Sequence, residues 1–305
     1  MEVSNPFIDQ ARLLVGLLPS VAKQDCFALK GGTAINLFLR DMPRLSVDID
    51  LAYLPIEDRE VSLDAIDKAL GEISADIEQH VPHIKIHASV LRATNSRLKL
   101  LAIQNGKSVK IEVTPVLRGS VYPPEIRKLS AKATETFGYA RISVLSFEDL
   151  YAGKICAALD RQHPRDLYDV YLLLQNEGIN ERLKNAFLVY LMGHNRPMAE
   201  LLSPQAQNIE ALYREELEGM SYEPIDFEEV RDTLPRLVSQ IHSAMSDADR
   251  HFLLELKQGI QDWRKFVLPE VEQLPSIRWK ILNLERMKPS GRKVAVEKLE
   301  KVLFG

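Results

Sequence analysis

The chain has few cysteines and no long apolar run. Only two of its 305 residues are cysteines, Cys26 and Cys156, a number that suits a reducing cytoplasm. The seven histidines show no ligand spacing with them, so a zinc cluster is not supported. No stretch approaches the roughly 18 apolar residues of a membrane span, and the N-terminal MEVSNPFIDQ is not a signal peptide. We therefore expect a cytoplasmic protein without a membrane partner.

A strong net charge is also lacking, but the charges are segregated along the chain. The formal net charge is −4. Residues 81–145 carry 11 basic and three acidic side chains, residues 205–275 carry 15 acidic and seven basic ones, and the chain turns basic again after 276. Such segregation could form a basic cleft for nucleic acid, or the charges could only solvate sheet edges and helix faces. Both interpretations remain open.

Hydrophobic periodicity predicts an α+β fold: an N-terminal domain with a mixed sheet of four or five strands, followed by a helical domain. We expect the boundary near residue 145, giving domains 1–145 and 146–305, with the helical domain contributing to the functional site. Thr33 is expected near the N-cap of a helix, and Asn105-Gly106 is expected to join two strands. The predicted strands are 26–31, 45–54, 84–93, 97–104 and 109–117, and the first predicted helices are 6–23, 33–40, 56–81, 146–161 and 164–178.

The most informative segment is LKGGTAINLFLRDMPRLSVDIDL, residues 29–51. The backbone N–H groups of Gly31-Gly32-Thr33 can surround a phosphate at the start of a helix. Asp48 and Asp50 lie on one face of a strand, because side chains alternate with period two. Two such carboxylates repel each other unless a cation neutralises them. Glycine pairs and alternating acids are each common alone, but together they indicate a metal-nucleotide site.

This combination resembles the DNA polymerase β-type nucleotidyltransferase superfamily, in which a Gly-Gly or Gly-Ser turn precedes a strand with Asp-x-Asp. The resemblance implies a third acid on a neighbouring strand, for which Lys110-Ile111-Glu112-Val113 supplies Glu112. Lys110 would share the face of Glu112 and contact a phosphate. The alternative is that Glu112 only forms an ion pair with a basic neighbour. Ser46 would lie beside Asp48 on the same face.

A second segment, FEDLYAGKICAALDRQHPRDLYDVYLLL (147–174), is more specific. Together with LKGGTAINLF and RLSVDIDL it resembles the AbiEii/AbiGii toxin family, which includes the MenT toxins, and the resemblance covers nearly the whole chain. The family's third motif corresponds to Lys154, Arg161 and Arg165-Asp166-x-x-Asp169. Arg161 and Arg165 could neutralise triphosphate charge or bind RNA phosphates, and Asp166 and Asp169 could orient Lys154 or the base and ribose of the nucleotide. The resemblance implies essential roles for Lys154 and Asp169, with Asp166 as the alternative aspartate. The alternative is an interhelical salt-bridge network that only holds two domains together.

These observations predict a Mg²⁺-dependent nucleotidyltransferase, with Mn²⁺ as an alternative metal, that uses an NTP as substrate. The resemblance implies a toxin of a bacterial toxin–antitoxin or phage-defence pair with a cognate antitoxin. It also implies transfer of NMP to RNA, in particular to the tRNA 3′ end, which would block translation. Transfer to a protein or small-molecule hydroxyl, and a non-catalytic binding module, are the alternatives. The expected catalytic residues are Asp48, Asp50, Lys154 and Asp169; the expected metal ligands are Asp48, Asp50 and Glu112; the expected nucleotide-binding residues are Lys30, Gly31, Gly32, Thr33, Ser46, Lys110, Arg165 and Asp166.

Overall fold

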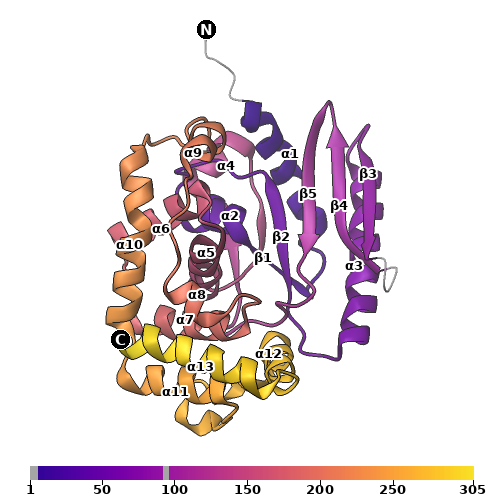
Figure 1. Cartoon of the computed structure of the whole chain (residues 1–305). Helices are drawn as coiled ribbons and strands as arrows, with labels where there is room; N and C mark the ends of the chain where they lie inside the picture. The colour runs from indigo at the N-terminus through magenta and orange to yellow at the C-terminus, as the bar shows by residue number, and fades with distance from the viewer. Residues whose placement is uncertain (1–5, 92–95) are drawn as a thin grey trace. The chain divides into compact units, whose positions relative to one another are not determined.

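A computed structural model describes residues 6–91 and 96–305 of the chain (Figure 1). The chain divides into two compact units. The first comprises residues 1–146 together with 218–224, and the second comprises residues 147–217 and 225–305. No helix among the described residues is long and apolar enough to cross a membrane.

The first unit is built on a seven-stranded mixed sheet with the strand order β3-β4-β5-β2-β1-β7-β6. The β2–β5 and β1–β7 pairs are parallel, and the other neighbouring strands are antiparallel. The predicted α+β class is confirmed. The strands are β1 (Phe27–Lys30), β2 (Asp48–Tyr53), β3 (Lys85–Leu91), β4 (Ser96–Gln104), β5 (Lys107–Val113), β6 (Glu125–Lys128) and β7 (Arg141–Val144).

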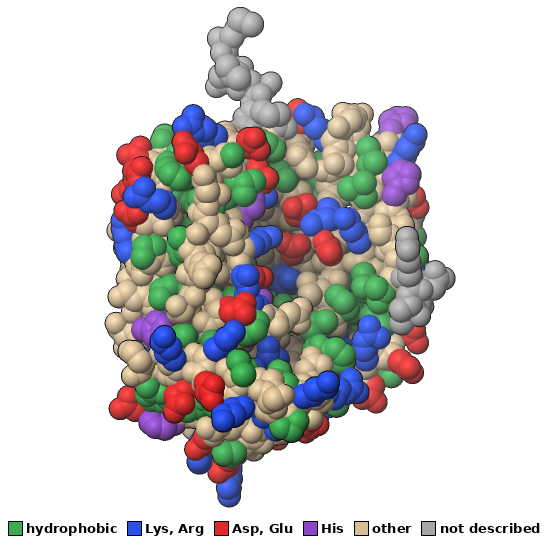
Figure 2. Space-filling view, in the orientation of Figure 1, with side chains coloured by type: hydrophobic (Ala, Val, Ile, Leu, Met, Phe, Trp, Pro, Cys, Tyr) green, Lys and Arg blue, Asp and Glu red, His purple; other side chains and the backbone are tan. Residues whose placement is uncertain are grey.

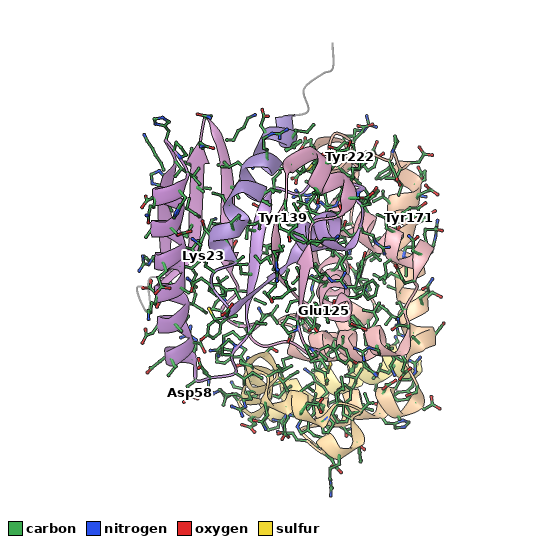
Figure 3. All side chains as sticks on the ribbon, turned by 180° about the vertical axis from the view of Figure 1, so that it is seen from behind. Lys23, Asp58, Glu125, Tyr139, Tyr171 and Tyr222 are labelled. Carbon is green, nitrogen blue, oxygen red and sulfur yellow. The ribbon has the colours of Figure 1, made fainter. Side chains whose placement is uncertain are left out.

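The prediction of four or five strands is wrong, because it omits β6 and β7. Each of these strands has only four residues, and β6 lies at the edge of the sheet with mostly exposed side chains. Neither strand therefore carries the apolar run or the long alternation that marks a strand in a sequence. Figure 3 shows this region from behind, with Glu125 at the start of β6 and the exposed Tyr139 shortly before β7 labelled.

The helices of the first unit include two that pack on the same side of the sheet, as Figures 1 and 3 show from opposite sides. Of these, α1 contacts β5 and β7, and α3 contacts β3 and β4. Lys30 is the N-cap residue of the short helix that follows, and Thr33 lies in its first turn, near the N-cap as predicted. The helices are α1 (Pro6–Val21), α2 (Gly31–Ala34), the π-helix η1 (Ile35–Leu39), α3 (Arg59–His80) and α4 (Ala131–Phe137).

Alternation along the two central strands places apolar residues in the core and acidic residues on the opposite face of the sheet. Ile49 and Leu51 of β2 and Ile111 of β5 are fully buried, whereas Asp48 and Asp50 between them are partly accessible. The predicted turn at Asn105-Gly106 is confirmed between β4 and β5, with positive φ at both residues as a type I′ turn requires.

The second unit is helical throughout, as the sequence predicts. Pro164 occupies the first turn of α6, where its missing N–H costs nothing, and Gly178 adopts a positive φ just beyond the end of that helix. The helices are α5 (Phe147–Arg161), α6 (Pro164–Asn176), α7 (Glu181–Gly193), α8 (Met198–Leu202), α9 (Glu210–Glu216), α10 (Phe227–Ala244), α11 (Asp247–Gln258), η2 (Trp263–Lys265), η3 (Pro269–Gln273), α12 (Pro275–Glu285) and α13 (Pro289–Phe304).

One segment of the chain returns to the first unit late in the sequence. Residues 218–224 pack beside the loop that precedes β2. The Leu45 N–H donates to the Met220 carbonyl (2.9 Å), and the Tyr222 N–H donates to the Pro43 carbonyl (2.8 Å). The Lys132 ammonium lies 4.1 Å from the centre of the Tyr222 ring. This segment therefore holds in place the loop that leads to Asp48.

Candidate functional site

The glycine turn lies directly against the first pair of carboxylates. Gly31 has φ +76°, and a Cβ atom there would come within 2.6 Å of Asp50 Oδ2. A Cβ atom on Gly32 would lie 2.9 Å from Arg44 Nη2 and 3.0 Å from Ser46 Oγ. At both positions a side chain would collide with neighbouring side-chain atoms, so glycine is required, and at Gly31 the positive φ also favours glycine. The turn brings main-chain atoms next to the acidic face, as the sequence predicts.

Sheet register brings the three predicted acids onto one face. Asp48 and Asp50 are alternate residues of β2, and the parallel pairing aligns Asp50 with Glu112 of β5. Lys30 is the register partner of Asp50 on the other side, in β1. Side chains of register partners leave the sheet on the same face. A basic side chain and three acids therefore share one patch of the sheet.

Lys110 connects the acids of this face. It is the register partner of Asp48, and its Nζ lies 3.0 Å from Glu112 Oε2. Burial of the ammonium opposes its charged form, but the hydrogen bond to Glu112 and the negative charges of Asp48, Glu112 and Asp50 together raise the pKa of Lys110. The ion pair that we considered as the alternative for Glu112 is therefore present. It leaves Lys110 charged and able to contact a phosphate.

Thr33 and Ser46 join the turn to the strand. The Thr33 hydroxyl donates to the Asp48 carbonyl at 2.5 Å and is hydrogen bonded to the Ser46 hydroxyl at 2.9 Å. Thr33 is 1% exposed and Ser46 7% exposed. Their hydroxyls therefore connect the glycine turn to the strand that carries the first carboxylate.

Arg44 is a residue that the sequence analysis missed. It is only 2% exposed, its Nη1 donates to the Leu45 carbonyl (2.9 Å), and its Nη2 lies against Gly32. A buried guanidinium beneath a glycine turn supplies positive charge where a phosphate would sit. Its position two residues before Ser46, in the same row as Ser46, Asp48 and Asp50, was the signal that could have identified it.

The donor set of this face fits a hard divalent cation. Asp48, Asp50 and Glu112 offer carboxylate oxygens only, which are the ligands that Mg²⁺ prefers, and Gly31 leaves room beside Asp50 that a Cβ atom would fill. Among the described residues, no group of three or more His, Cys, Asp or Glu side chains is already arranged around one metal position.

In the second unit, Lys154 of α5 binds two aspartates of α6. Its Nζ lies 2.7 Å from Asp166 Oδ1 and 3.0 Å from Asp169 Oδ2. The lysine side chain is 7% exposed, and those of the two aspartates are 2% and 0% exposed. Both predicted partners of Lys154 are therefore confirmed as its neighbours. The interhelical network considered as the alternative is therefore present, but it joins two helices of the same unit and not two domains.

Asp166 is held ionised by this network. Burial opposes its charge, but Lys154 and then Arg161, whose Nε lies 2.6 Å from Asp166 Oδ2, lower the pKa of Asp166 well below its ordinary range. The side chain of Arg161 is 63% exposed, whereas that of Lys154 is buried. The ammonium of Lys154 is thus held at a fixed position between two carboxylates.

Arg165 lies apart from Lys154 in this network. Its Nη2 and His163 Nε2 both contact Glu216 Oε2, at 3.0 and 3.1 Å. Burial and then the positive charge of Arg165 lower the pKa of His163, which also caps α6 through its Nδ1. Arg165 is therefore committed at least in part to a contact with α9.

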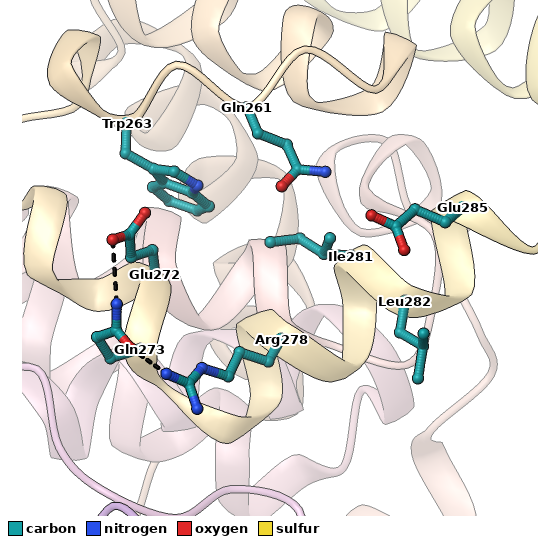
Figure 4. A pocket seen from close by; sticks show the side chains of 8 residues that line it. All are labelled: Gln261, Trp263, Glu272, Gln273, Arg278, Ile281, Leu282 and Glu285. Atoms are coloured by element: carbon teal, nitrogen blue, oxygen red, sulfur yellow. Dashed lines mark hydrogen bonds between the residues drawn. The ribbon is translucent and has the colours of Figure 1, made fainter.

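A pocket of about 500 Å³ lies elsewhere in the second unit (Figure 4). Its lining includes Trp263, the carboxylates of Glu272 and Glu285, and Arg278, which is hydrogen bonded to Gln273. None of the predicted site residues lines it. Its two acids outnumber its one arginine, which makes it a poor site for a phosphate.

The charge runs of the sequence do not produce one large basic surface on the face shown in Figure 2. Acidic and basic side chains are interspersed there. Arg92, one of the basic residues counted in 81–145, lies outside the described residues.

A mixed sheet that carries a glycine turn and alternating carboxylates is the architecture of a nucleotidyltransferase. The sequence profile described as "Nucleotidyl transferase AbiEii toxin, Type IV TA system" matches residues 12–280. The chain therefore belongs to this family of nucleotidyltransferase toxins of type IV toxin–antitoxin systems. Membership implies an NTP substrate and an antitoxin partner.

Among solved structures, the chain is similar to the MenT4 nucleotidyltransferase toxin from Mycobacterium tuberculosis H37Rv. The two share 14% sequence identity and a TM-score of 0.60, over 91% of each chain. At this identity the likeness supports the fold. Comparison with curated proteins finds no match.

Proposed function

We propose that this toxin transfers an NMP group from an NTP to the 3′ end of RNA, with tRNA as the acceptor. The observation that carries the proposal is the parallel register of β2 and β5, which puts Asp48, Asp50, Lys110 and Glu112 on one face beside the Gly31-Gly32 turn. Nucleotidyl transfer needs both the glycine turn and the charged face of the sheet, because a triphosphate must be held while negative charge develops at the α-phosphorus.

The proposed reaction is an in-line displacement. The acceptor hydroxyl oxygen forms a bond to the α-phosphorus, the bond from that phosphorus to the bridging oxygen breaks, and pyrophosphate leaves. The hydroxyl proton passes to a carboxylate of Asp48 or Asp50. Mg²⁺ bound by Asp48, Asp50 and Glu112 would neutralise phosphate charge and lower the pKa of the attacking hydroxyl. The turn, Lys110, Arg44 and Ser46 would hold the phosphates.

Lys154 and Asp169 are proposed to act in the same reaction. Lys154 is a buried point charge fixed by two carboxylates, which suits an electrostatic role toward phosphate oxygens. Asp169 positions it. Addition of nucleotides to the tRNA 3′ end would prevent aminoacylation and thereby stop translation, either as part of a toxin–antitoxin pair or in phage defence.

Labelled NTPs incubated with the protein, Mg²⁺ and total RNA test this proposal, followed by sequencing of RNA 3′ ends. We expect label in small structured RNA and one or more nucleotides added to tRNA 3′ ends. Label in protein alone would refute the RNA acceptor. The absence of any transferred label with every NTP and with either Mg²⁺ or Mn²⁺ would refute the activity itself.

A further inference from the structure

Three cations gather in the second unit without a carboxylate partner. Lys257 lies in the last turn of α11, Lys280 on α12 and Arg292 in the first turns of α13. We call them the cationic cluster. In the described part of the chain, none of the three forms an ion pair with an acid, and Lys257 has no hydrogen-bond acceptor although it is only 6% exposed. The Lys257 side chain is therefore largely buried, but its Nζ is not among the buried atoms that lack a partner, so the ammonium reaches solvent and is open to an anion.

The other two cations make contacts only with neutral groups. Lys280 Nζ donates to the carbonyl of His194 at 2.6 Å and lies 3.4 Å from that of Arg196. Arg292 Nη2 donates to the Leu284 carbonyl, while its Nε is buried without a partner. These contacts orient the two side chains at helix ends but do not neutralise their charges.

The backbone of α11 leaves room for this gathering. Gly259, two residues after Lys257, ends the helix with φ +98°, and a Cβ atom there would lie 3.0 Å from Arg292 Nη1. Burial and then the charge of Arg292 lower the pKa of Lys257. Burial and then the charge of Lys257 lower the pKa of Lys280 to about 8. The charge of Arg292 therefore acts on Lys257, and the charge of Lys257 acts on Lys280.

Another buried lysine of the same unit, in contrast to the cationic cluster, is paired with acidic side chains. Lys184 is 5% exposed, but its Nζ lies 2.8 Å from both Glu181 Oε1 and Asp249 Oδ2. These two acids outweigh the effect of burial and raise the pKa of Lys184. The cationic cluster lacks this compensation, so an external anion would supply it.

We propose that Lys257, Lys280 and Arg292 form a binding site for a phosphate group of a nucleotide or of RNA. A phosphate has several acceptor oxygens, which matches the unused donors of Lys257 and the unpaired Nε of Arg292. The site lies wholly within the second unit and shares no residue with the carboxylate face, the face of the sheet that carries Asp48, Asp50 and Glu112. The identification of this phosphate as part of a substrate rests on the proposed function. The binding of phosphate at the site does not depend on it.

Binding of two probes, measured without Mg²⁺ and therefore without turnover, tests the site. Inorganic pyrophosphate stands for the nucleotide, and a short RNA with a blocked 3′ end stands for the acceptor. Lys257→Met should weaken binding of at least one probe about tenfold or more, because it removes a charge-assisted contact. Loss of the pyrophosphate affinity alone identifies the nucleotide as the source, and loss of the RNA affinity alone identifies the acceptor.

The matched control is Lys293→Met, which removes the same charge from an exposed position of α13. It should leave both affinities within about twofold. Ligand-free Lys257→Met should be at least as stable to heat as the parent protein, since it removes the charge of a largely buried side chain that forms no ion pair. Lys280→Met is a second variant should Lys257→Met not fold.

Unchanged affinity for both probes in Lys257→Met and in Lys280→Met would overturn the site. A protein that binds the probes through Lys257 but transfers no nucleotide would keep the site and refute the proposed function instead. The two inferences can therefore fail separately.

Discussion

At the scale of single residues, the glycine turn is restricted by its neighbour Asp50. Gly31 combines a positive φ with a direct approach to a carboxylate oxygen, so two separate constraints act on one position. Gly106 has nearly the same φ, +74°, but a Cβ atom there would meet nothing within 4 Å. Substitutions at Gly31 and Gly106 should therefore cause similar backbone strain, but only a substitution at Gly31 should displace Asp50.

Gly31→Ala should therefore lose more than stability. Both Gly31→Ala and the control Gly106→Ala should cost about 1–2 kcal/mol of unfolding free energy from the left-handed backbone. Only Gly31→Ala should also displace Asp50 and abolish nucleotidyl transfer. Thermal melts and the transfer assay measure the two effects. Equal activity of the two variants would contradict the placement of the turn in the site.

The carboxylates of β2 should be needed for chemistry and not for folding. Asp48→Asn removes one charge from a face that already carries Asp50 and Glu112, so the unfolding free energy should change little. Activity should fall by at least about 10²-fold, because several kcal/mol of charge stabilisation in the transition state depend on this site. Asp64→Asn on the exposed side of α3 is the control. Transfer rates within threefold of the parent in Asp48→Asn would refute its role.

At the scale of elements, α5 and α6 are joined by the network of Lys154. Lys154→Met should destabilise the protein by about 3–5 kcal/mol, since it leaves Asp166 and Asp169 buried without their shared cation. Arg161→Met is the matched comparison, because Arg161 reaches the same Asp166 from an exposed position and should cost less than about 1 kcal/mol. Urea unfolding measures both values, and similar losses in the two variants would contradict this account.

The same network predicts a dependence of stability on pH. The pKa of Asp166 is lower in the folded protein than in the unfolded chain, so its contribution to stability is present above the ordinary value of about 4 and is lost as the pH falls below it. Unfolding free energies measured between pH 7 and pH 3 should show this loss. In Lys154→Met the loss should be smaller, because the main positive neighbour is gone.

At the scale of the whole molecule, the first unit is not a continuous stretch of sequence. Residues 218–224 belong to it, and they pair with the backbone of the loop at Pro43 and Leu45. That loop carries Arg44 and leads to Ser46 and Asp48. The folding of a segment between two helices of the other unit is thus coupled to the candidate site.

A fragment of residues 1–146 should therefore have a weakened site even though it contains every residue of the carboxylate face. Without Met220, the Leu45 N–H loses its acceptor, and we expect its amide to exchange at least tenfold faster than in the full chain, which corresponds to about 1.4 kcal/mol. Hydrogen exchange measures this, with the amide of Ile111 in β5 as the internal control. Equal protection of Leu45 in the fragment and the full chain would contradict the coupling.

Much of the fold could be predicted because its signals are local. The alternation of β2, the turn at Asn105-Gly106 and the start of α6 at Pro164 each depend on residues close together in the chain, and the structure confirms them. The missed strands β6 and β7 are short, and the exposed edge position of β6 leaves no apolar pattern. The missed Arg44 carries a charge that normally marks the surface, and only its 2% exposure reveals its place under the turn.

The family, the glycine turn, the acids on alternate positions and the lysine near two aspartates could be predicted from the amino-acid sequence, because each signal lies within a short stretch of chain. Only the folded structure reveals that Asp50 lies beside Glu112, that residues 218–224 return to the first unit, and that Lys257 is largely buried without a carboxylate. The physical reason is that strand register and side-chain burial depend on packing between residues far apart in the chain, which no local period encodes.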